Sequence, residues 1–484
     1  MRPGFVLLGV LALLLTPRVT TAEGLHDLYS DAGELSATLV AAEGKVHIGD
    51  LEVDGATYNG DYAGPVWHVH PGDLMRIRLI NHLSQPTNLH FHGMRSSPLG
   101  NGDNAHILIQ PKNSLDYEVR IPLSQPPGVY WYHAHFHRFA EHQTMSGLSG
   151  TIIVEGPIRP SVTARLFVLK DMVFEDDIGN SEIDETLHGI VQSINGRLMT
   201  SEAMRPGETQ LWRFTNQSAN RFVHIALEGH RFHIVGQDGE PSATPDPVDI
   251  VNIPPGSRFD LLVDSGEAGR YALLVKGLMT KTGTARVLDR VIGTLDVSGQ
   301  PLPQGEAMPA RVLPRDLRAA EIDQSRTIVF TETTTTNAAD QKFYINGLIF
   351  DAARIDVRVP LGHIEEWTIR NDTDDLHVFH IHQIGFQVVE VDGQAVPFTG
   401  YIDNVQVPAR GEVKVRMPFT DPLILGRFMF HCHVLKHEDG GMMGNIEIYD
   451  PAPPTLSVRL NRFYMHVLWW WHGVPWSLCG LADA

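Results

Sequence analysis

The sequence predicts an all-β protein with three tandem domains, each folded as a β-sandwich or Greek-key barrel. Short alternating or β-branched runs recur along the chain, whereas helical periodicity is scarce. The 44 glycines and 31 prolines among 484 residues supply the many turns that such domains need. One pattern of turn residues occurs three times, and the length also suits about three domains.

The expected strands are runs of alternating or β-branched residues that Gly and Pro turns separate. Representative strands are expected at residues 74–79, 210–215, 258–263 and 412–417. A linker rich in Pro and charged residues is expected at 298–325, and a shorter one at 156–161. The expected domains are therefore residues 23–157, 158–302 and 303–450.

The internal repeat links the three domains to one ancestral pattern. Each unit has an Asn-Gly pair, then a turn glycine, then an asparagine nine residues later. These positions are Asn59-Gly60, Gly72 and Asn81, then Asn195-Gly196, Gly207 and Asn216, then Asn346-Gly347, Gly362 and Asn371. Nine further residues reach His90 in the first unit and His380 in the third, but Ile225 in the middle unit. The outer units therefore carry histidine pairs, and the middle unit has apolar residues instead.

A cluster of candidate metal ligands lies near the end of the third unit. His431, Cys432, His433, His437 and Met442 fall within twelve residues, and Cys432 is one of two cysteines in the chain. A thiolate, an imidazole and a thioether form the soft, mixed ligand set of a blue copper site. Because adjacent strand residues point to opposite faces, the histidines flanking Cys432 must face away from a metal that Cys432 binds. The pattern predicts two metal sites back to back, with electron transfer between them.

Histidine pairs elsewhere in the outer units predict the second site. A single His-x-His pair is more often explained by packing or solvent exposure, but four pairs with one built around a cysteine favour metal binding. The paired imidazoles are His90, His92, His133, His135, His380, His382, His431 and His433. These eight side chains suffice for three coppers, and His377, Cys432, His437 and Met442 complete a fourth. The isolated histidines and His137 are expected to be packing or solvent residues.

With these motifs the chain resembles the multicopper oxidases, specifically bacterial laccase-like members with three cupredoxin domains. The resemblance covers roughly residues 35 to 449. The matching segments are Leu89-His-Phe-His-Gly93, Trp131-Tyr-His-Ala-His135, His377-Val-Phe-His-Ile-His382 and His431-Cys-His-Val-Leu-Lys-His-Glu-Asp-Gly-Gly-Met-Met443. The last segment is the most specific, because ligand identity, order and spacing all match.

The resemblance implies one type 1, one type 2 and two type 3 coppers per chain. The type 1 site would use His377, Cys432 and His437, with Met442 as a weak axial ligand and Met443 as the competing candidate. The type 2 copper would bind His90 and His380. One type 3 copper would bind His92, His133 and His433, and the other His135, His382 and His431. Four stored electrons would reduce O2 to two waters.

Two carboxylates match family positions linked to proton delivery. Glu438 directly follows His437, and Asp103 lies in the segment Asn101-Gly-Asp103. Reduction of O2 to water consumes four protons, which metal-bound histidines cannot provide. An ordinary exposed acid remains the alternative for each residue.

Three functions remain open from the sequence. The first is a laccase-like oxidase of phenols and other aromatic donors with O2 as the acceptor. The second is a metallo-oxidase of Cu(I), Fe(II) or Mn(II) with the same copper centres. The third is a non-catalytic cupredoxin relative, which should have lost ligands that are all present in this chain. The reductant is thus a small aromatic molecule or a metal ion, and the oligomeric state stays open.

The ends and the charge of the chain add three expectations. Residues 1–22 resemble a secretory signal peptide, with an apolar stretch too short for a comfortable membrane span, so we expect export to the periplasm or medium. Residues 451–484 form a tail of unknown role that departs from the family pattern. The formal charge of −19 suits a soluble acidic protein or attraction of cationic reductants. No basic patch suggests nucleic-acid binding.

Overall fold

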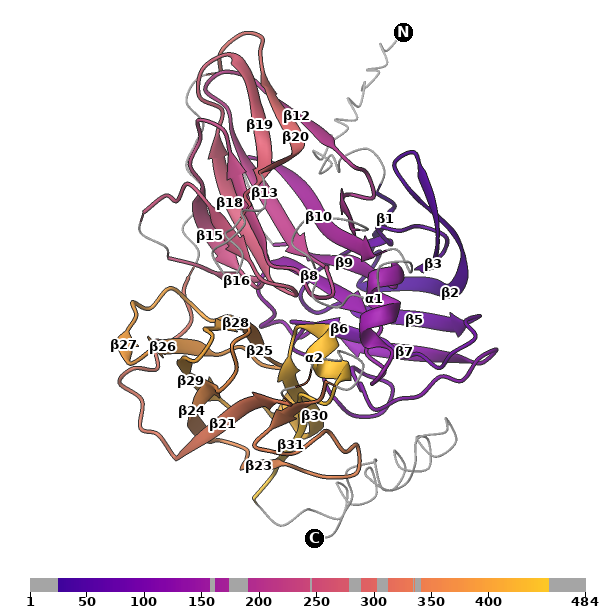
Figure 1. Cartoon of the computed structure of the whole chain (residues 1–484), viewed down its shortest axis with the longest axis vertical. Helices are drawn as coiled ribbons and strands as arrows, with labels where there is room; N and C mark the ends of the chain where they lie inside the picture. The colour runs from indigo at the N-terminus through magenta and orange to yellow at the C-terminus, as the bar shows by residue number, and fades with distance from the viewer. Residues whose placement is uncertain are drawn as a thin grey trace, which may run out of the picture.

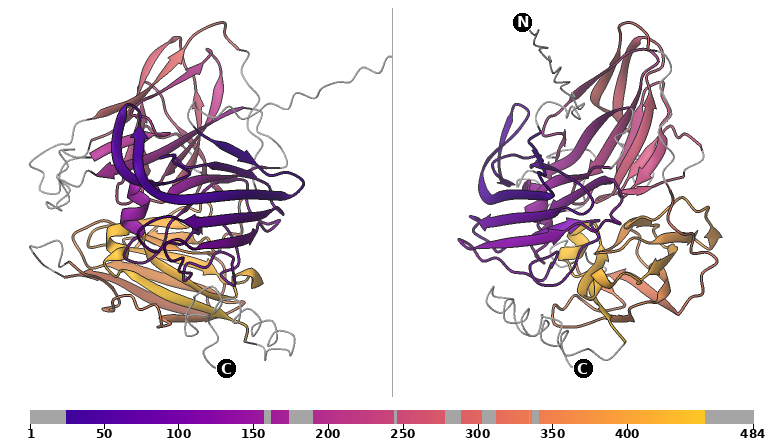
Figure 2. Two further views of the ribbon diagram at one scale, coloured as in Figure 1. Left: turned by 90° about the vertical axis from the view of Figure 1, so that its right-hand side faces the viewer. Right: turned by 180° about the vertical axis from the view of Figure 1, so that it is seen from behind.

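The computed structural model describes residues 25–156, 162–173, 190–243, 246–277, 289–302, 312–333, 335 and 341–451. The described strands form six sheets, two in each third of the chain, which confirms the predicted all-β fold class. The three units appear as separate lobes in Figures 1 and 2, and the first and third units meet beside the two short helices α1 and α2. The expected signal peptide and nearly all of the expected tail lie outside the described residues.

The first unit packs a four-stranded sheet, in the order β3-β2-β5-β7, on a five-stranded sheet, in the order β1-β4-β9-β8-β6. Its elements are β1 (Asp27–Tyr29), β2 (Glu34–Ile48), β3 (Leu51–Tyr58), β4 (Val66–Val69), β5 (Leu74–Asn81), β6 (His90–His92), β7 (Ser114–Arg120), β8 (Gly128–His133), α1 (Ala140–Ser146) and β9 (Ser149–Val154). The expected strand at 74–79 is therefore β5.

The middle unit has sheets in the orders β11-β10-β13-β18-β15-β16 and β12-β20-β19-β14-β17. Its strands are β10 (Thr163–Val173), β11 (Ile190–Ile194), β12 (Thr200–Met204), β13 (Thr209–Asn216), β14 (Val223–Leu227), β15 (His233–Gln237), β16 (Glu240–Pro241), β17 (Val251–Ile253), β18 (Arg258–Asp264), β19 (Gly269–Val275) and β20 (Arg290–Val297). The expected strands at 210–215 and 258–263 correspond to β13 and β18.

The third unit has sheets in the orders β22-β21-β24-β29-β26-β27 and β23-β31-β30-β25-β28. Its elements are β21 (Gln324–Glu332), β22 (Phe343–Ile345), β23 (Val357–Pro360), β24 (Ile364–Asn371), β25 (His377–Ile381), β26 (Gln387–Val391), β27 (Gln394–Ala395), β28 (Asn404–Val407), β29 (Glu412–Pro418), η3 (Pro422–Ile424), β30 (Gly426–Cys432), α2 (Leu435–Asp439) and β31 (Met443–Tyr449). The expected strand at 412–417 is β29.

The same topology recurs in each unit, as the repeat predicts. The strand that opens each unit's repeat pairs in parallel with the strand after its turn glycine: β2 with β5, β10 with β13, and β21 with β24. Each Asn-Gly pair has both residues at positive φ, which is the backbone of the tight hairpin turn that this dipeptide favours. The later asparagines also share one role. Asn81, Asn216 and Asn371 each donate two hydrogen bonds from Nδ2, one to a main-chain carbonyl in the loop that follows and one to a carbonyl of a more distant segment.

Each unit has its own hydrophobic core between its two sheets. A fully buried tryptophan lies in each core: Trp67 in the first, Trp212 in the second and Trp367 in the third. Truncating such a residue to alanine typically costs about 3–5 kcal/mol, so each sandwich can hold its strands rigidly. This rigidity matters for the histidines, which lie on strands or directly beside them.

Candidate functional site

One group of ligand-type atoms forms around Cys432, which ends strand β30. His377 Nδ1 lies 3.4 Å from Cys432 Sγ, His437 Nδ1 lies 3.6 Å from that sulfur, and the two nitrogens are 3.0 Å apart. We call His377, Cys432 and His437 the cysteine group. Burial raises the pKa of the Cys432 thiol to about 12. A buried thiolate therefore needs a compensating cation, and a bound metal would supply one.

The rings of the cysteine group are oriented by their neighbours. Thr373 Oγ1 lies 2.8 Å from His377 Nε2, so the ring nitrogen remote from the sulfur has a hydrogen-bond partner. The His437 ring stacks on Phe343, with centroids 4.3 Å apart. These contacts leave both Nδ1 atoms directed at the sulfur.

The structure separates the two methionines that compete for the axial position. Met442 is fully buried in the same core cluster as Cys432, and its carbonyl accepts a 3.1 Å hydrogen bond from the Cys432 amide. Met443 instead pairs with His431 across strands β30 and β31, and packs on Ala105 and Met429. Directly opposed strand residues share a face, so Met443 points away from the Cys432 sulfur. The packing favours Met442.

The eight paired imidazoles come together as three further groups where the first and third units meet. They are His90 with His92 and His380, His92 with His133 and His433, and His135 with His382 and His431, with His92 counted in two groups. We call these the three imidazole groups. Burial lowers the pKa of several of these rings, to about 3 at His133 and about 4 at His135. Neutral rings follow, and neutral imidazole is the form that binds metal.

Tautomers within the imidazole groups are set by nearby acceptors. His90 Nδ1 lies 2.9 Å from Asp103 Oδ1, and His380 Nδ1 lies 2.8 Å from the Asp403 carbonyl. His133 Nδ1 similarly lies 3.0 Å from the Ala134 carbonyl. In each neutral ring the Nδ1–H donates to that oxygen, so Nε2 carries a lone pair.

Those lone pairs have no hydrogen-bond partner among the described residues. Nε2 of His90, His133 and His380 is buried and unpartnered. Leaving a polar atom buried and unpaired costs about 1–3 kcal/mol. In the third group, Nε2 of His135, His382 and His431 lie 3.1–3.2 Å from one another, although three such atoms cannot all be bonded mutually by the few protons available. Imidazole is a preferred copper ligand, so a bound copper resolves both observations.

Strand geometry divides the residues around Cys432 among different groups. Cys432 belongs to the cysteine group, whereas His431 and His433 belong to two of the imidazole groups. The predicted back-to-back arrangement is therefore present in the structure. His431 Nδ1 also lies 3.0 Å from the Cys432 carbonyl, which ties the His431 ring to the same peptide unit.

Both carboxylates singled out from the sequence are buried beside the imidazoles. Glu438 is fully buried, with Oε2 3.1 Å from His431 Nδ1 and Oε1 3.7 Å from His135 Nδ1. Its burial would raise its pKa, but His135 and His431 outweigh this effect and lower the pKa to about 2. Asp103 contacts His90, and burial raises the pKa of Asp103 to about 7 despite hydrogen bonds from the Phe91 amide and Gln383. Neither residue is the ordinary exposed acid of the alternative interpretation.

Several residues at the site were not predicted. Asp403 contacts the His92 and His380 rings, and Thr373 contacts His377. Asp439 accepts main-chain hydrogen bonds from Arg138 and Glu141 in the first unit. No local spacing marks Asp403 and Asp439, because each contacts segments far away in the sequence, whereas Thr373 lies only four residues before His377.

The remaining histidines fall outside the four groups, as expected. His137 lies against the Phe350 ring, with centroids 4.9 Å apart, and is absent from every ligand group. His68 is also outside the four groups, but it is buried between Asp27 and Glu155. It forms an ion-pair contact rather than a metal site.

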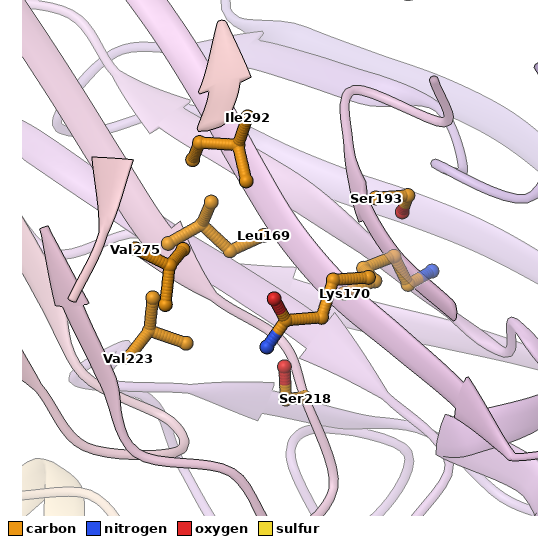
Figure 3. A pocket seen from close by; sticks show the side chains of 8 residues that line it. Leu169, Lys170, Ser193, Ser218, Val223, Val275 and Ile292 are labelled. Atoms are coloured by element: carbon orange, nitrogen blue, oxygen red, sulfur yellow. The ribbon is translucent and has the colours of Figure 1, made fainter. Parts of the chain in front are cut away.

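A small cavity lies within the middle unit, away from the histidines. Apolar side chains line it together with Lys170, Gln192, Ser193 and Ser218, and its volume of about 10 Å³ would hold one water (Figure 3). The Lys170 ammonium donates to the carbonyls of Tyr62 and Gly147, which lie in the first unit. Lys170 therefore lines the cavity with its side chain and joins the middle unit to the first through its ammonium group. Within the described ranges, no helix has the length and apolar character to cross a membrane.

Family models and known proteins match most of the chain. The chain matches multicopper oxidase family models over residues 41–158, 180–295 and 321–452. The multicopper oxidase mco of Staphylococcus haemolyticus is 24% identical over 408 residues, which are 81% of this chain and 83% of that protein. The cell division protein FtsP of Escherichia coli is 26% identical over 425 residues, 82% of this chain and 85% of that protein.

A solved structure also shares the fold. The multicopper oxidase from Campylobacter jejuni, described as a metallo-oxidase, has a TM-score of 0.75 at 24% identity, covering 89% of this chain and 96% of that chain. The three family matches together span most of the sequence, one on each unit. The chain therefore belongs to the multicopper oxidase family.

Proposed function

We propose that this protein is a laccase-like oxidase that takes single electrons from aromatic donors and reduces O2 to water. Four donor molecules each lose one electron and one proton, and one O2 gains four electrons and four protons to give two waters. The observation that carries this proposal is the convergence of buried, unpartnered imidazole nitrogens beside a buried cysteine group. Bound copper would supply the one-electron redox chemistry that neither protein side chains nor O2 alone provide.

The proposed ligands account for four coppers in each chain. The cysteine group with Met442 would hold the type 1 copper. His90 and His380 would hold the type 2 copper. The type 3 pair would be held by His92, His133 and His433 on one side and by His135, His382 and His431 on the other. Each type 3 set corresponds to one of the three imidazole groups.

The chain supplies a short covalent route between the two kinds of site. Cys432 lies in the cysteine group, and its immediate neighbours His431 and His433 reach two of the imidazole groups. Each route from sulfur to imidazole crosses one peptide unit. The fold thus holds the donor side and the oxygen side at a constant separation.

Glu438 and Asp103 are proposed to deliver protons to the oxygen side. Both carboxyl groups are buried against rings of the imidazole groups, where bulk water is excluded. A carboxyl group at that position can hold a proton and release it to a neighbouring oxygen species. Asp103 has a second role, because its Oδ1 orients the His90 ring.

The surface beside the cysteine group favours an organic donor. Leu348 and Ile349 are exposed by 48% and 42%. Ile349 lies close to Gly441, because a Cβ added to Gly441 would be 2.9 Å from Ile349 Cγ2. Gly441 in turn lies just after the helix that carries His437. Exposed apolar side chains suit an aromatic ring. Fe(II) and Mn(II) favour sites that include carboxylates, and the described residues contain no fifth cluster of three His, Cys, Asp or Glu side chains.

Copper analysis and spectroscopy test the proposal. The loaded protein should hold four coppers per chain, absorb strongly in the orange-red and consume O2 with a phenol. Cys432→Ser should abolish the orange-red band and turnover while retaining up to three coppers. Fewer than four coppers together with no O2 uptake would contradict the oxidase, and agree with a non-catalytic relative.

A donor comparison tests the substrate class. Steady-state kcat/KM should be higher for phenols than for Cu(I), Fe(II) or Mn(II). Leu348→Ser and Ile349→Ser should raise KM for phenols and leave the metal-ion rates unchanged. Faster oxidation of a metal ion by the native protein would instead favour the metallo-oxidase.

Export is proposed on the sequence of residues 1–22 alone. Cell fractionation should recover the mature chain outside the cytoplasm, beginning after Ala22. A cytosolic chain that keeps residues 1–22 would contradict export.

A further inference from the structure

A fully buried arginine of the middle unit reaches toward the imidazole groups. Arg258 begins strand β18 and is 1% exposed. Its Nη1 and Nη2 atoms each donate a 2.7 Å hydrogen bond to one oxygen of Asp403 in the third unit. Its Nε donates at 3.2 Å to the Val129 carbonyl of the first unit, on the strand that ends at His133. One side chain therefore joins all three units.

Asp403, which Arg258 holds, contacts two of the proposed copper ligands. Its Oδ1 lies 3.2 Å from His92 Nε2, and its carbonyl oxygen lies 2.8 Å from His380 Nδ1. A charged carboxylate accepts a hydrogen bond more strongly than a neutral ring nitrogen does. His92 Nε2–H therefore donates to Asp403, and His92 Nδ1 keeps the lone pair. That Nδ1 lies 3.2 Å from His433 Nε2. Asp403 thus selects which nitrogen of each ring is free for metal.

Asp238 completes the support of this ion pair. Its Oδ1 accepts from the Arg258 amide at 2.9 Å, and its carbonyl accepts from Arg258 Nη2 at 2.9 Å. Its Oδ2 accepts from the Asp403 and Asn404 amides at 3.3 and 3.2 Å. The guanidinium is therefore surrounded by acceptors, and the Asp403 main chain is held as firmly as its side chain.

Two glycines make room for the network. Gly93 directly follows His92 and has φ +78, and a Cβ there would overlap Arg258 Nη2 and approach Asp403. A Cβ on Gly256 would lie 2.6 Å from Asn404 Nδ2 and 2.8 Å from His433 Cε1. The first and middle units therefore approach the third through glycine backbone at the points where ligands are held.

We propose that Arg258 is a positioning residue for the copper cluster, and that the ligand-free middle unit uses it to hold His92 and His380 through Asp403. The inference rests on the ligand set given under the proposed function. It assigns the middle unit a role beyond packing, because removing the guanidinium would free the Asp403 carboxylate to rotate and would leave its charge buried without a partner. The His92 ring would then lose the acceptor that defines its tautomer and orientation, and the residue whose carbonyl accepts from His380 Nδ1 would lose its side-chain anchor.

The matched control is another buried Arg–Asp pair in the same unit. Arg213 and Asp260 are 5% exposed each and oppose one another across strands β13 and β18, with Nε and Oδ1 3.6 Å apart. Neither residue is in a ligand group. Arg213→Met therefore removes a buried ion pair without touching a proposed ligand.

The experiment compares Arg258→Met, Arg258→Lys, Asp403→Asn and Arg213→Met with the native protein. Copper per chain, the electron paramagnetic resonance of type 2 copper, near-ultraviolet absorption of the type 3 pair and the unfolding midpoint are measured for each. The orange-red band of the type 1 copper is the internal reference. We expect Arg258→Met and Asp403→Asn to retain cluster copper about 10- to 100-fold less tightly, with altered type 2 hyperfine splitting and an unchanged orange-red band. Arg258→Lys should recover part of the lost copper retention, since lysine keeps the positive charge but cannot form the bidentate pair of hydrogen bonds.

The outcomes separate the inference from the function on which it rests. Native-like copper content and resonance in both Arg258→Met and Asp403→Asn would overturn the positioning role. Equal spectral changes in Arg213→Met would overturn it as well, since any buried pair would then suffice. If the native protein binds no cluster copper, the proposed function itself fails. If Arg258→Met does not fold, Asp403→Asn and Arg258→Lys decide by the same spectra.

Discussion

Single residues in the imidazole groups owe their metal-binding form to the main chain around them. Burial lowers the pKa of rings such as His380 and His133, and the Asp403 and Ala134 carbonyls accept the Nδ1 proton of these two rings. A neutral ring with a directed lone pair is thus built in before any metal arrives. Glu438 differs from these rings because it is charged: burial would raise its pKa, but two neighbouring imidazoles outweigh burial and lower the pKa.

Glu438→Gln should slow O2 reduction by about 10²-fold, the low end of general acid–base effects, while all four coppers stay bound. The amide keeps the size of the side chain but cannot carry the proton. Oxygen uptake and the reoxidation rate of the fully reduced protein measure the effect. Glu447→Gln serves as a control, because Glu447 is also buried but pairs with Arg358 and belongs to none of the ligand groups. Unchanged turnover in a fully loaded Glu438→Gln protein would refute the proton role.

Met442→Leu and Met443→Leu form a matched pair at the cysteine group. Removing the thioether donor at Met442 favours reduced copper, so the type 1 potential should rise, whereas Met443→Leu should leave it unchanged. Both are volume-conserving changes that typically cost less than about 1.5 kcal/mol in stability. Redox titration of the orange-red band measures the potential. A shift in Met443→Leu alone would reverse the assignment.

At the scale of elements, the two short helices depend on each other across the interface of the first and third units. Helix α1 has no side-chain cap of its own at Phe139. Asp439, at the end of α2, supplies one by accepting from the amides of Arg138 at 2.6 Å and Glu141 at 2.8 Å. The cap also fixes α2, which carries His437 and Glu438.

Asp439→Ala should lower the free energy of unfolding by about 1–2 kcal/mol, the typical effect of losing a helix cap. Denaturant unfolding monitored by tryptophan fluorescence measures this change. Asp54→Ala is the control, since the Asp54 side chain is 85% exposed in a surface pair with Lys45 and should cost little. Equal stability of Asp439→Ala and the native protein would exclude an interdomain cap.

A second element is held by a charge, because parallel strand β1 is tied to β4 through His68. Asp27 and Glu155 contact the two ring nitrogens of His68, and Tyr29 stacks on the ring. The charge of Arg213 helps to lower the pKa of Glu155. Burial opposes protonation, but the two carboxylates outweigh it and raise the pKa of His68.

A group with a raised folded-state pKa stabilises the fold fully below its unfolded pKa, about 6.5 for histidine, and loses that contribution as pH rises through the folded value. The stability difference between native protein and His68→Gln should therefore be largest near pH 6 and shrink above that. Urea unfolding at pH 6.0 and 8.5 measures it. His47→Gln, at a side chain 70% exposed, should show no such trend. A difference independent of pH would mean that His68 acts by packing alone.

The sequence predicts more of the repeated elements than of the contacts between them. Strands such as β5 and β29, the Asn-Gly turns and the histidine pairs follow from local periodicity and ligand spacing, and the structure places them as expected. Helices α1 and α2 have too few residues to show a period. Asp403, Arg258 and Asp439 act on partners more than 100 residues away, so no local pattern marks them.

At the scale of the whole molecule, the imidazole groups lie between the first and third units. Every imidazole group combines residues of the first unit with residues of the third, and Arg258 adds the middle unit to the same region. Each unit has its own hydrophobic core, so the sandwiches could in principle unfold one at a time. Metal at the interface would couple them.

Removal of copper should therefore lower both stability and cooperativity. Copper that binds the folded interface and not the unfolded chain would add about 4 kcal/mol at a free concentration 1,000 times its dissociation constant. Differential scanning calorimetry should show one high transition for the loaded protein and a lower, broader or split transition after chelation. Restoring copper should restore the single transition, while calcium, which prefers oxygen ligands, should not. Identical transitions before and after chelation would mean that the imidazole groups hold no metal between the units, because a ligand that bridges two folding units must make the unfolding of one depend on the other.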